Sequence, residues 1–133
     1  MKQCHYCGVQ ISDNYIRCQA CDNIVKWCDK LTTYWKDKNV EAIVSMFDEK
    51  CECYDDPFAR AENIKELWQE IETQNIHQIS SNILFTKKHE CVVEFTICYE
   101  DEICNAINHI KFNEFNSKCI YLKQWYMNKE IKE

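Results

Sequence analysis

The sequence predicts an α+β protein in which a short amino-terminal metal-binding segment precedes a single larger domain. Three observations predict this arrangement. Two C-x-x-C pairs occupy residues 4–21, apolar residues then recur with the 3.6-residue period of helices over residues 24–71, and the period falls to two from Ile76 onward. We therefore expect residues 1–22 to form one unit and residues 23–133 a second.

Bulk composition excludes several classes of partner. The chain has 133 residues, of which 46% are hydrophobic and 29% charged, as in ordinary globular domains. A formal net charge of −6 argues against nucleic-acid binding, which needs clustered basic residues. No run approaches the ~20 apolar residues of a membrane span, and Met1 is followed by no apolar stretch typical of a signal peptide. We expect a cytoplasmic protein without membrane or nucleic-acid partners.

The amino-terminal cysteines have the spacing of a tetrahedral metal site. They are Cys4, Cys7, Cys18 and Cys21. Each C-x-x-C pair places two sulfurs on one side of a tight turn, and two such turns supply the four ligands that Zn²⁺ prefers. Gly8, the only glycine, follows the first pair, where we expect a positive φ. The segment resembles a zinc ribbon, with a hairpin over residues 9–16 and a structural ion that has no vacant coordination position.

Two other uses of the cysteine pairs are weaker alternatives. A thiol–disulfide redox site needs only one pair, and rubredoxin-type iron normally has a longer spacer than the ten residues 8–17. The remaining cysteines are predicted to be small apolar core residues in a reducing compartment. They are Cys28, Cys51, Cys53, Cys91, Cys98, Cys104 and Cys119.

Three apolar stripes predict three amphipathic helices that face a common core. The stripes are Ile24, Trp27, Cys28, Leu31 and Trp35; Val40, Ile43, Val44 and Phe47; and Ile64, Leu67, Trp68 and Ile71. Asn39 is a suitable N-cap for the second helix, and the third is expected to begin near Ala61.

The rest of the chain predicts a mainly antiparallel sheet. A short strand over residues 51–56 ends at the only proline. Alternating apolar residues then predict four strands, at 76–87, 90–100, 103–113 and 118–128, joined by short polar turns. Strands that follow helices in this order are typical of an α+β fold with the helices on one face of a curved sheet.

Residues 23–128 resemble the nuclear transport factor 2-like superfamily, which includes ketosteroid isomerase and the SnoaL-like cyclases. Residues 39–49 look like its second-helix signature, residues 54–58 like the strand end that carries the base in the isomerases, and residues 104–113 like the strand that carries their oxyanion donor. The resemblance implies a cone-shaped α+β barrel in which the sheet curls around the long helix and leaves an apolar cavity.

The resemblance also implies roles for individual residues. Asp56 would be the carboxylate that moves a proton, and Asn108 would donate a hydrogen bond to the oxyanion. The catalytic tyrosine of the isomerases falls on Leu31 here, and Tyr34 lies about one turn further along the helix. The residues assigned to ligand binding are Tyr34, Phe58 and Tyr126.

Three functional hypotheses follow. The first is an isomerase or cyclase in which Asp56 removes a proton next to a carbonyl group. The second is a non-catalytic pocket for a small apolar ligand. The third is an interaction module in which the zinc ribbon and the outer sheet face dock to another protein. Homodimerisation through the sheet is a further expectation from the resemblance.

Overall fold

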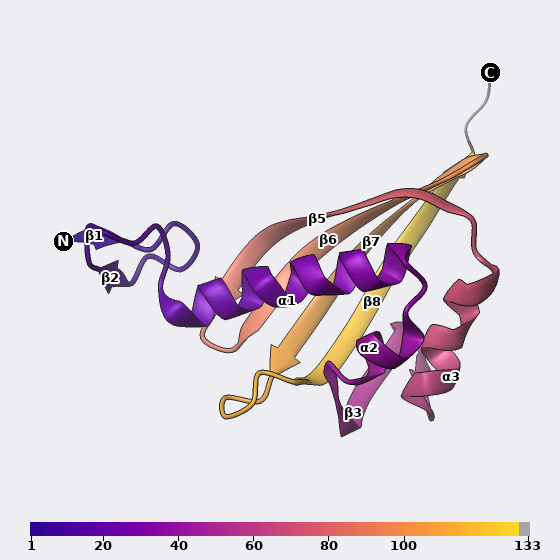
Figure 1. Cartoon of the computed structure of the whole chain (residues 1–133), viewed down its shortest axis with the longest axis horizontal. Coiled ribbons are helices and arrows are strands. Elements are labelled where there is room, and N and C mark those ends of the chain that lie inside the picture. Colours follow the sequence, from indigo (N-terminus) through magenta and orange to yellow (C-terminus); the bar gives the residue numbers. More distant parts are fainter. Residues whose placement is uncertain (131–133) are drawn as a thin grey trace.

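The computed structural model describes residues 1–130, which form one long helix, two short helices, a 3₁₀ turn and two sheets (Figure 1). The helical elements are α1 (Gln19–Lys36), α2 (Val40–Val44), α3 (Ile64–Gln69) and η1 (Glu70–Thr73). The strands are β1 (Lys2–Gln3), β2 (Gln10–Ile11), β3 (Phe47–Asp56), β4 (Ala59–Ala61), β5 (Ile76–Lys87), β6 (Glu90–Tyr99), β7 (Glu102–Phe112) and β8 (Cys119–Glu130).

The larger sheet has six strands in the order β4-β3-β8-β7-β6-β5. All neighbouring pairs are antiparallel except β3 and β8, which run parallel. Within the described residues β4 and β5 are its two edges, so the sheet is an open cone rather than a closed barrel. The α+β prediction is confirmed, and the barrel is corrected to an open, mixed sheet.

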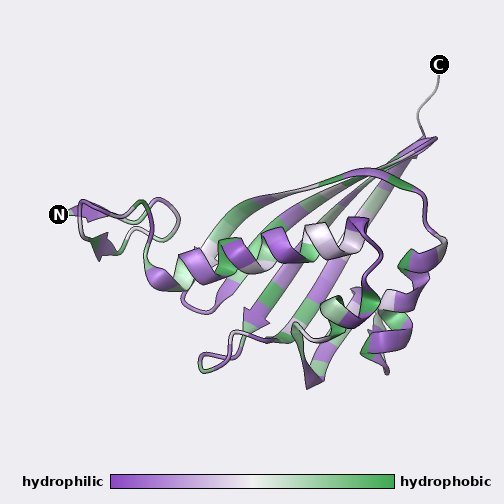
Figure 2. Ribbon diagram, in the orientation of Figure 1, coloured by the Kyte–Doolittle hydropathy of each residue, from purple (hydrophilic) through white to green (hydrophobic). Residues whose placement is uncertain are grey.

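Helix α1 lies across the inner face of the sheet, and α2 and α3 cover its lower end (Figure 1). The buried stripe of α1 is the one that the sequence predicts, with Cys21 added at its start. Figure 2 shows hydrophobic and hydrophilic residues alternating along the strands, as expected when one face of a sheet packs against helices. In β7, for example, Ala106, Asn108 and Ile110 point to the core, while the residues between them are less buried.

Two element boundaries differ from the sequence-based expectation. Phe47 begins β3 instead of ending the second helix, because the Cys119 N–H donates to the Met46 carbonyl (2.9 Å) and draws this segment into the sheet. Helix α3 begins at Ile64, since the Asn63 side chain caps it by accepting from the Glu66 N–H (3.1 Å). The predicted Asn39 cap of α2 is confirmed, with the Ala42 N–H donating to Oδ1 at 3.2 Å.

The amino-terminal unit continues directly into α1. Strands β1 and β2 pair antiparallel on either side of the first cysteine turn, so the hairpin closes around residues 4–9 and not within residues 9–16. Helix α1 starts at Gln19, which places Cys21 inside its first turn. Figure 1 shows this unit extending beyond the sheet from the start of α1. No helix in residues 1–130 is both long and apolar enough to cross a membrane.

The cysteines outside this unit mostly fill the core. All eleven cysteines are free thiols. Five of the seven predicted core cysteines are buried: Cys28, Cys51, Cys53, Cys91 and Cys119. Cys98 and Cys104 are only partly buried.

Candidate functional site

The four amino-terminal cysteines form a candidate metal centre. Their Sγ atoms all lie within 4.8 Å of one another, and those of Cys7 and Cys18 are 3.7 Å apart. Tetrahedral zinc with Zn–S bonds of about 2.3 Å needs sulfurs separated by about 3.8 Å, whereas a disulfide needs about 2.05 Å. The donor set therefore fits a zinc-ribbon-like site with a complete shell of four thiolates.

Local backbone structure positions the first cysteine pair. The Cys4 N–H donates to the Val9 carbonyl (2.7 Å) and the Gly8 N–H to the Cys4 carbonyl (3.0 Å), which closes a tight turn. Gly8 has φ +79°, as predicted, a conformation that residues with a Cβ resist. This turn directs both sulfurs of the pair to one side.

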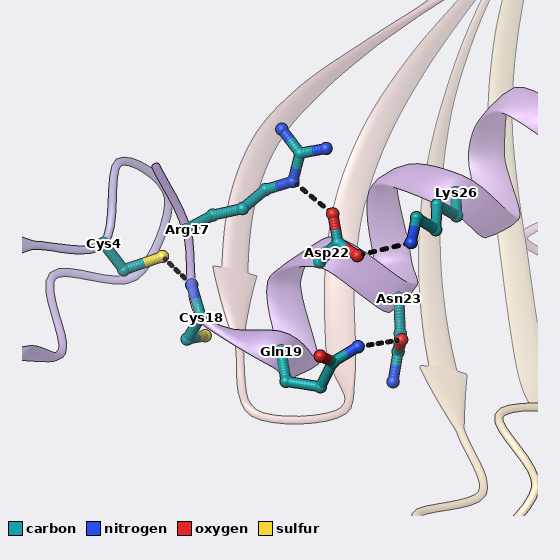
Figure 3. Close-up of polar contacts among 7 residues, drawn as sticks. All are labelled: Cys4, Arg17, Cys18, Gln19, Asp22, Asn23 and Lys26. Carbon is teal, nitrogen blue, oxygen red and sulfur yellow. Dashed lines mark hydrogen bonds and ion pairs between the residues drawn. The ribbon is translucent and has the colours of Figure 1, made fainter. Parts of the chain in front are cut away.

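The second pair uses a helix start. Cys18 is the N-cap of α1 and its N–H donates to the Cys4 sulfur at 3.3 Å (Figure 3). Burial raises the pKa of Cys4, but hydrogen bonds from the backbone of Cys7, Cys18 and Tyr6 outweigh it and lower the pKa to about 6. A helix amino terminus also favours negative charge. Burial raises the pKa of Cys21, and the pKa of Cys7 is also raised despite a hydrogen bond from the Val9 backbone, so the low pKa of Cys4 is not shared by the whole set.

An ion-pair network joins the amino-terminal unit to α1. The Arg17 Nε atom lies 2.9 Å from Asp22 Oδ1, and Lys26 Nζ lies 2.8 Å from Asp22 Oδ2 (Figure 3). Hydrogen bonding from Lys26 lowers the pKa of Asp22. The network fixes the residue that precedes Cys18 against the first turns of the helix.

Thr86 connects the amino-terminal unit to the sheet. Its Oγ1 atom on β5 lies 3.4 Å from the Cys21 sulfur, and both residues are buried, at 4% and 2% exposure. Thr86 and Asn108 are the two buried polar residues in the described part of the chain. A hydroxyl at an otherwise apolar position is satisfied by this sulfur, and hydrogen bonds to metal ligands orient them.

Replacing Thr86 with Val should lower metal affinity by roughly 10- to 100-fold, because Cys21 loses its hydrogen-bond donor. Thr86→Ser should retain the affinity. Titration with Co²⁺, read from its thiolate charge-transfer absorption, measures the effect directly. Thr33→Val, on the exposed face of α1, is the matched control. Wild-type affinity in Thr86→Val would show that the contact does not support the site.

A cavity of about 530 Å³ lies between the helices and the inner sheet face. This volume is typical of small-molecule pockets. Its walls come from α1 (Leu31, Trp35), β3 (Asp55), α3 and η1 with the following residues (Leu67, Trp68, Glu70, Ile71, Gln74, Asn75), β6 and its turn (Phe95, Ile97, Tyr99, Glu100, Asp101), β7 (Glu102, Cys104, Ala106, Asn108) and β8 (Leu122, Gln124, Tyr126, Asn128).

Asp55 is the carboxylate of β3 that lines the cavity. Cys51 and Cys53 on the same strand are buried, and alternation puts Asp55 on their face. Gln124 Nε2 donates to the Asp55 carbonyl (3.2 Å) and approaches its Oδ1 at 3.5 Å. Burial, and then the charge of Asp56, raise the pKa of Asp55.

Polar side chains continue this row across the sheet. On β8, Gln124 neighbours Asp55, and on β7 Asn108 is the direct register partner of Gln124. Asn108 is only 1% exposed, and its Nδ2 has no hydrogen-bond partner. The row Asp55–Gln124–Asn108 thus places a carboxyl group and an amide on one wall of the cavity.

Two indoles supply further unpaired donors. Trp35 and Trp68 meet edge to face, with ring centroids 5.0 Å apart. Four buried side-chain atoms lack partners in the described part of the chain: Trp35 Nε1, Trp68 Nε1, Gln74 Oε1 and Asn108 Nδ2. All four belong to residues of the cavity wall. Buried polar atoms are normally paired, so these four atoms are available to a ligand or to water in the cavity.

The residues proposed from sequence do not all meet at the cavity. Asn108 and Tyr126 line it. Asp56 does not; its Oδ1 accepts from the Phe58 N–H (2.8 Å) at the β3–β4 turn. Phe58 is 97% exposed at that turn, and Tyr34 is partly buried beside the core without lining the cavity. The alternation Cys51–Cys53–Asp55 was the sequence signal for the carboxylate that lines the cavity, whereas no sequence signal paired Trp35 with Trp68.

Comparisons with known proteins support the fold. No family model matches the chain, and no curated protein is significantly similar in sequence. Among solved structures, a nuclear transport factor 2-like protein of unknown function from Burkholderia xenovorans superimposes with a TM-score of 0.68 at 13% identity, covering 82% of this chain and 86% of its own.

Two other similar structures have names that suggest chemistry. A candidate scytalone dehydratase from Novosphingobium aromaticivorans has a TM-score of 0.61 at 16% identity, covering 85% of this chain and 88% of its own. An epoxide hydrolase/cyclase-like enzyme of pyran ring formation in the polyether salinomycin has a TM-score of 0.65 at 13% identity, covering 82% and 91%. At such identities the likeness establishes the fold, which is nuclear transport factor 2-like.

Proposed function

We propose that this chain, with its nuclear transport factor 2-like fold, binds a small apolar carbonyl compound in the cavity and that Asp55 transfers a proton on it. The observation that carries the proposal is the row Asp55–Gln124–Asn108 on the cavity wall. Similar structures with names of a dehydratase and a cyclase support proton-transfer chemistry. Asp55 takes the role that the sequence assigned to Asp56.

The proposed step is removal of a proton from the carbon next to the carbonyl group. The Asp55 carboxylate takes the proton, the C–H electron pair forms the C=C bond of an enolate, and negative charge develops on the oxygen. An amide N–H of Asn108 stabilises that charge. A raised pKa brings the strength of Asp55 as a base closer to the working pH. Return of the proton to the same or another carbon completes exchange or isomerisation.

Deuterium exchange tests this proposal without knowledge of the natural substrate. Naphthyl methyl ketone, incubated with the protein in D₂O, should lose its methyl proton NMR signal faster than with heat-denatured protein. If the protein binds the ketone but the exchange rate equals that in buffer alone, the second candidate function, a non-catalytic ligand pocket, would be favoured. Leu31 at the position of the isomerase tyrosine favours that candidate.

We also propose that the ion held by the four cysteines is Zn²⁺ with a structural role. Zinc accepts four thiolates in a closed tetrahedron. When bound it supplies folding energy to a unit that is too small to bury its own core. The four cysteines leave no coordination position for a substrate, so we place the chemistry in the cavity alone.

The outer face of the sheet is the surface that we propose for a homodimer. Trp125 and Met127 on β8 are 43% and 77% exposed, and Phe85 on β5 is 55% exposed. Lys123 lies over the rings of Tyr54 and Trp125, at 5.4 and 5.5 Å. Trp125 and Met127 lie on one strand, whereas β7 and β6 separate Phe85 from them; exposed apolar side chains on such a face favour association.

The double variant Trp125→Glu/Met127→Lys should convert the proposed dimer to a monomer, because it adds charge to an apolar interface. Light scattering coupled to size exclusion should give twice the 16.0 kDa chain mass for the wild type and one chain mass for the variant. Phe115→Ser, at a 90% exposed residue in the β7–β8 loop, is the control. A monomeric wild type at micromolar concentration would contradict the proposal.

A further inference from the structure

We infer that the cavity discriminates by charge, admitting uncharged oxygen-bearing molecules and excluding anions such as carboxylates, sulfates and phosphates. This inference rests on the proposed function, because it concerns the ligand of the same cavity. It narrows the substrate class to neutral carbonyl compounds.

Every charged residue on the cavity wall is acidic. They are Asp55, Glu70, Glu100, Asp101 and Glu102, and within residues 1–130 no lysine, arginine or histidine contributes to the wall. Several basic side chains have partners elsewhere: Arg17 and Lys26 contact Asp22, and Lys111 lies over the Tyr121 ring on the outer face. An anion entering the cavity would therefore meet carboxylates and no counter-charge.

The acidic residues stand at one end of the cavity. Glu100, Asp101 and Glu102 form the β6–β7 turn, and Glu70 begins η1. Glu70, Glu100 and Asp101 are exposed, whereas Glu102 and Asp55 are partly buried, so the carboxylates give this part of the wall a negative potential. An anion that enters past these side chains meets like charges, which oppose its binding.

Two titratable side chains of the cavity wall, Tyr99 and Cys104, have raised pKa values. Burial, with the charges of Cys104 and Glu102, raises the pKa of Tyr99 to about 12. Burial, with the charges of Glu102 and Asp55, also raises the pKa of Cys104. Burial, the larger cause, opposes any charge in the wall, and the Glu102 and Asp55 carboxylates add a contribution that opposes negative charge.

The unpaired donors define what the cavity accepts. Trp35, Trp68 and Asn108 each have a buried nitrogen without a partner. A neutral carbonyl, hydroxyl or ether oxygen can accept from such groups without bringing net charge. The indole rings supply apolar surface for the rest of the molecule. An uncharged, largely apolar molecule with one or more oxygen acceptors fits both features.

Two probes of matched shape test the inference. Naphthyl methyl ketone is neutral and naphthoate is its anionic counterpart at neutral pH. In equilibrium dialysis against the full-length protein, the ketone should bind at least about tenfold more tightly than naphthoate. Higher ionic strength should narrow this ratio, since salt screens the wall charges.

The matched variant removes the negative charges of the β6–β7 turn at the cavity opening. In Glu100→Gln/Asp101→Asn/Glu102→Gln, the ratio of the naphthoate dissociation constant to the ketone dissociation constant should fall several-fold. The single variant Glu70→Gln, on the other side of the opening, should lower this ratio too. It replaces the triple variant if that variant does not fold. Equal binding of both probes by the wild type, or an unchanged ratio in the folded variant, would overturn the charge selection and leave the pocket standing. Failure of both probes to bind folded protein would instead contradict the proposed function.

Discussion

Asp55→Asn should slow protein-catalysed deuterium exchange of naphthyl methyl ketone by roughly 10²- to 10⁴-fold, the usual contribution of a general base. An amide has nearly the shape of the carboxyl group but cannot take up the proton. Binding of the ketone should persist, because Asp55 is one of many residues of the cavity wall and its replacement leaves the apolar contacts of the wall in place. Proton NMR in D₂O measures the exchange rate, and equilibrium dialysis measures the binding.

Asp56→Asn is the matched control for this prediction. Asp56 is the next residue on the same strand, yet its carboxylate accepts from the Phe58 backbone at the turn and does not line the cavity. Exchange should therefore change by less than about threefold, within the range of a mutation away from the chemistry. A large loss of exchange rate in Asp56→Asn, with none in Asp55→Asn, would contradict this assignment and indicate that Asp56 is the base, as the sequence resemblance implies.

Removal of the metal should destabilise the whole chain and not only its first residues. A ligand at 1,000 times its Kd contributes about 4 kcal/mol to stability, and structural zinc is usually held more tightly than this. The Cys21–Thr86 contact and the continuous helix α1 transmit the loss to the sheet. Chelation, or the variant Cys7→Ser, should lower Tm clearly and expose residues 5–17 to proteolysis.

Cys98→Ser is the control for the metal experiment, since this partly buried thiol lies on β6 outside the cluster. Metal analysis should give one zinc per chain in the wild type and in Cys98→Ser, and a reduced content in Cys7→Ser. Unchanged Tm and full metal content in Cys7→Ser would show that the four sulfurs do not act as a single site.

The sequence predicts the architecture well because its signals are periodic and local. The stripe from Ile24 to Trp35 and the alternation through β6 and β7 are repeated over enough residues to identify the elements. Two element boundaries depend on single hydrogen bonds. Strand β3 begins at Phe47 because the Cys119 N–H donates to the Met46 carbonyl, and α3 begins at Ile64 because the Glu66 N–H donates to the Asn63 side chain. Such contacts leave no periodic trace in the sequence.

The two sites differ in how far the sequence defines them. All four candidate metal ligands lie within residues 4–21, so their spacing alone predicts the cysteine cluster that the structure contains. The cavity wall is assembled from distant segments. A shift of one residue along a strand moves a side chain to the opposite face of the sheet. The family resemblance placed the carboxylate role on Asp56, whereas the alternation of buried residues along β3 places Asp55 on the cavity face. The contact between Trp35 and Trp68 requires the tertiary fold.

The pH dependence of Asp55 follows from the direction of its pKa. Because the folded chain raises this pKa above the ordinary value of 3.8, the folded state binds the proton more readily than the unfolded state does. The favourable contribution of protonated Asp55 is therefore fully present below pH 3.8 and is lost as pH rises through the folded-state pKa. Asp55→Asn removes this dependence, so its stability relative to the wild type should improve with rising pH in that interval.

Titration of the Asp55 side-chain carboxyl by ¹³C NMR, with and without naphthyl methyl ketone, tests most directly whether this carboxyl group serves the cavity. We predict a midpoint above 3.8 that shifts when the ketone binds, because the ligand displaces water from the carboxyl group. A midpoint at or below 3.8 that does not respond to bound ketone would contradict the assignment of Asp55 as the proton-transferring group.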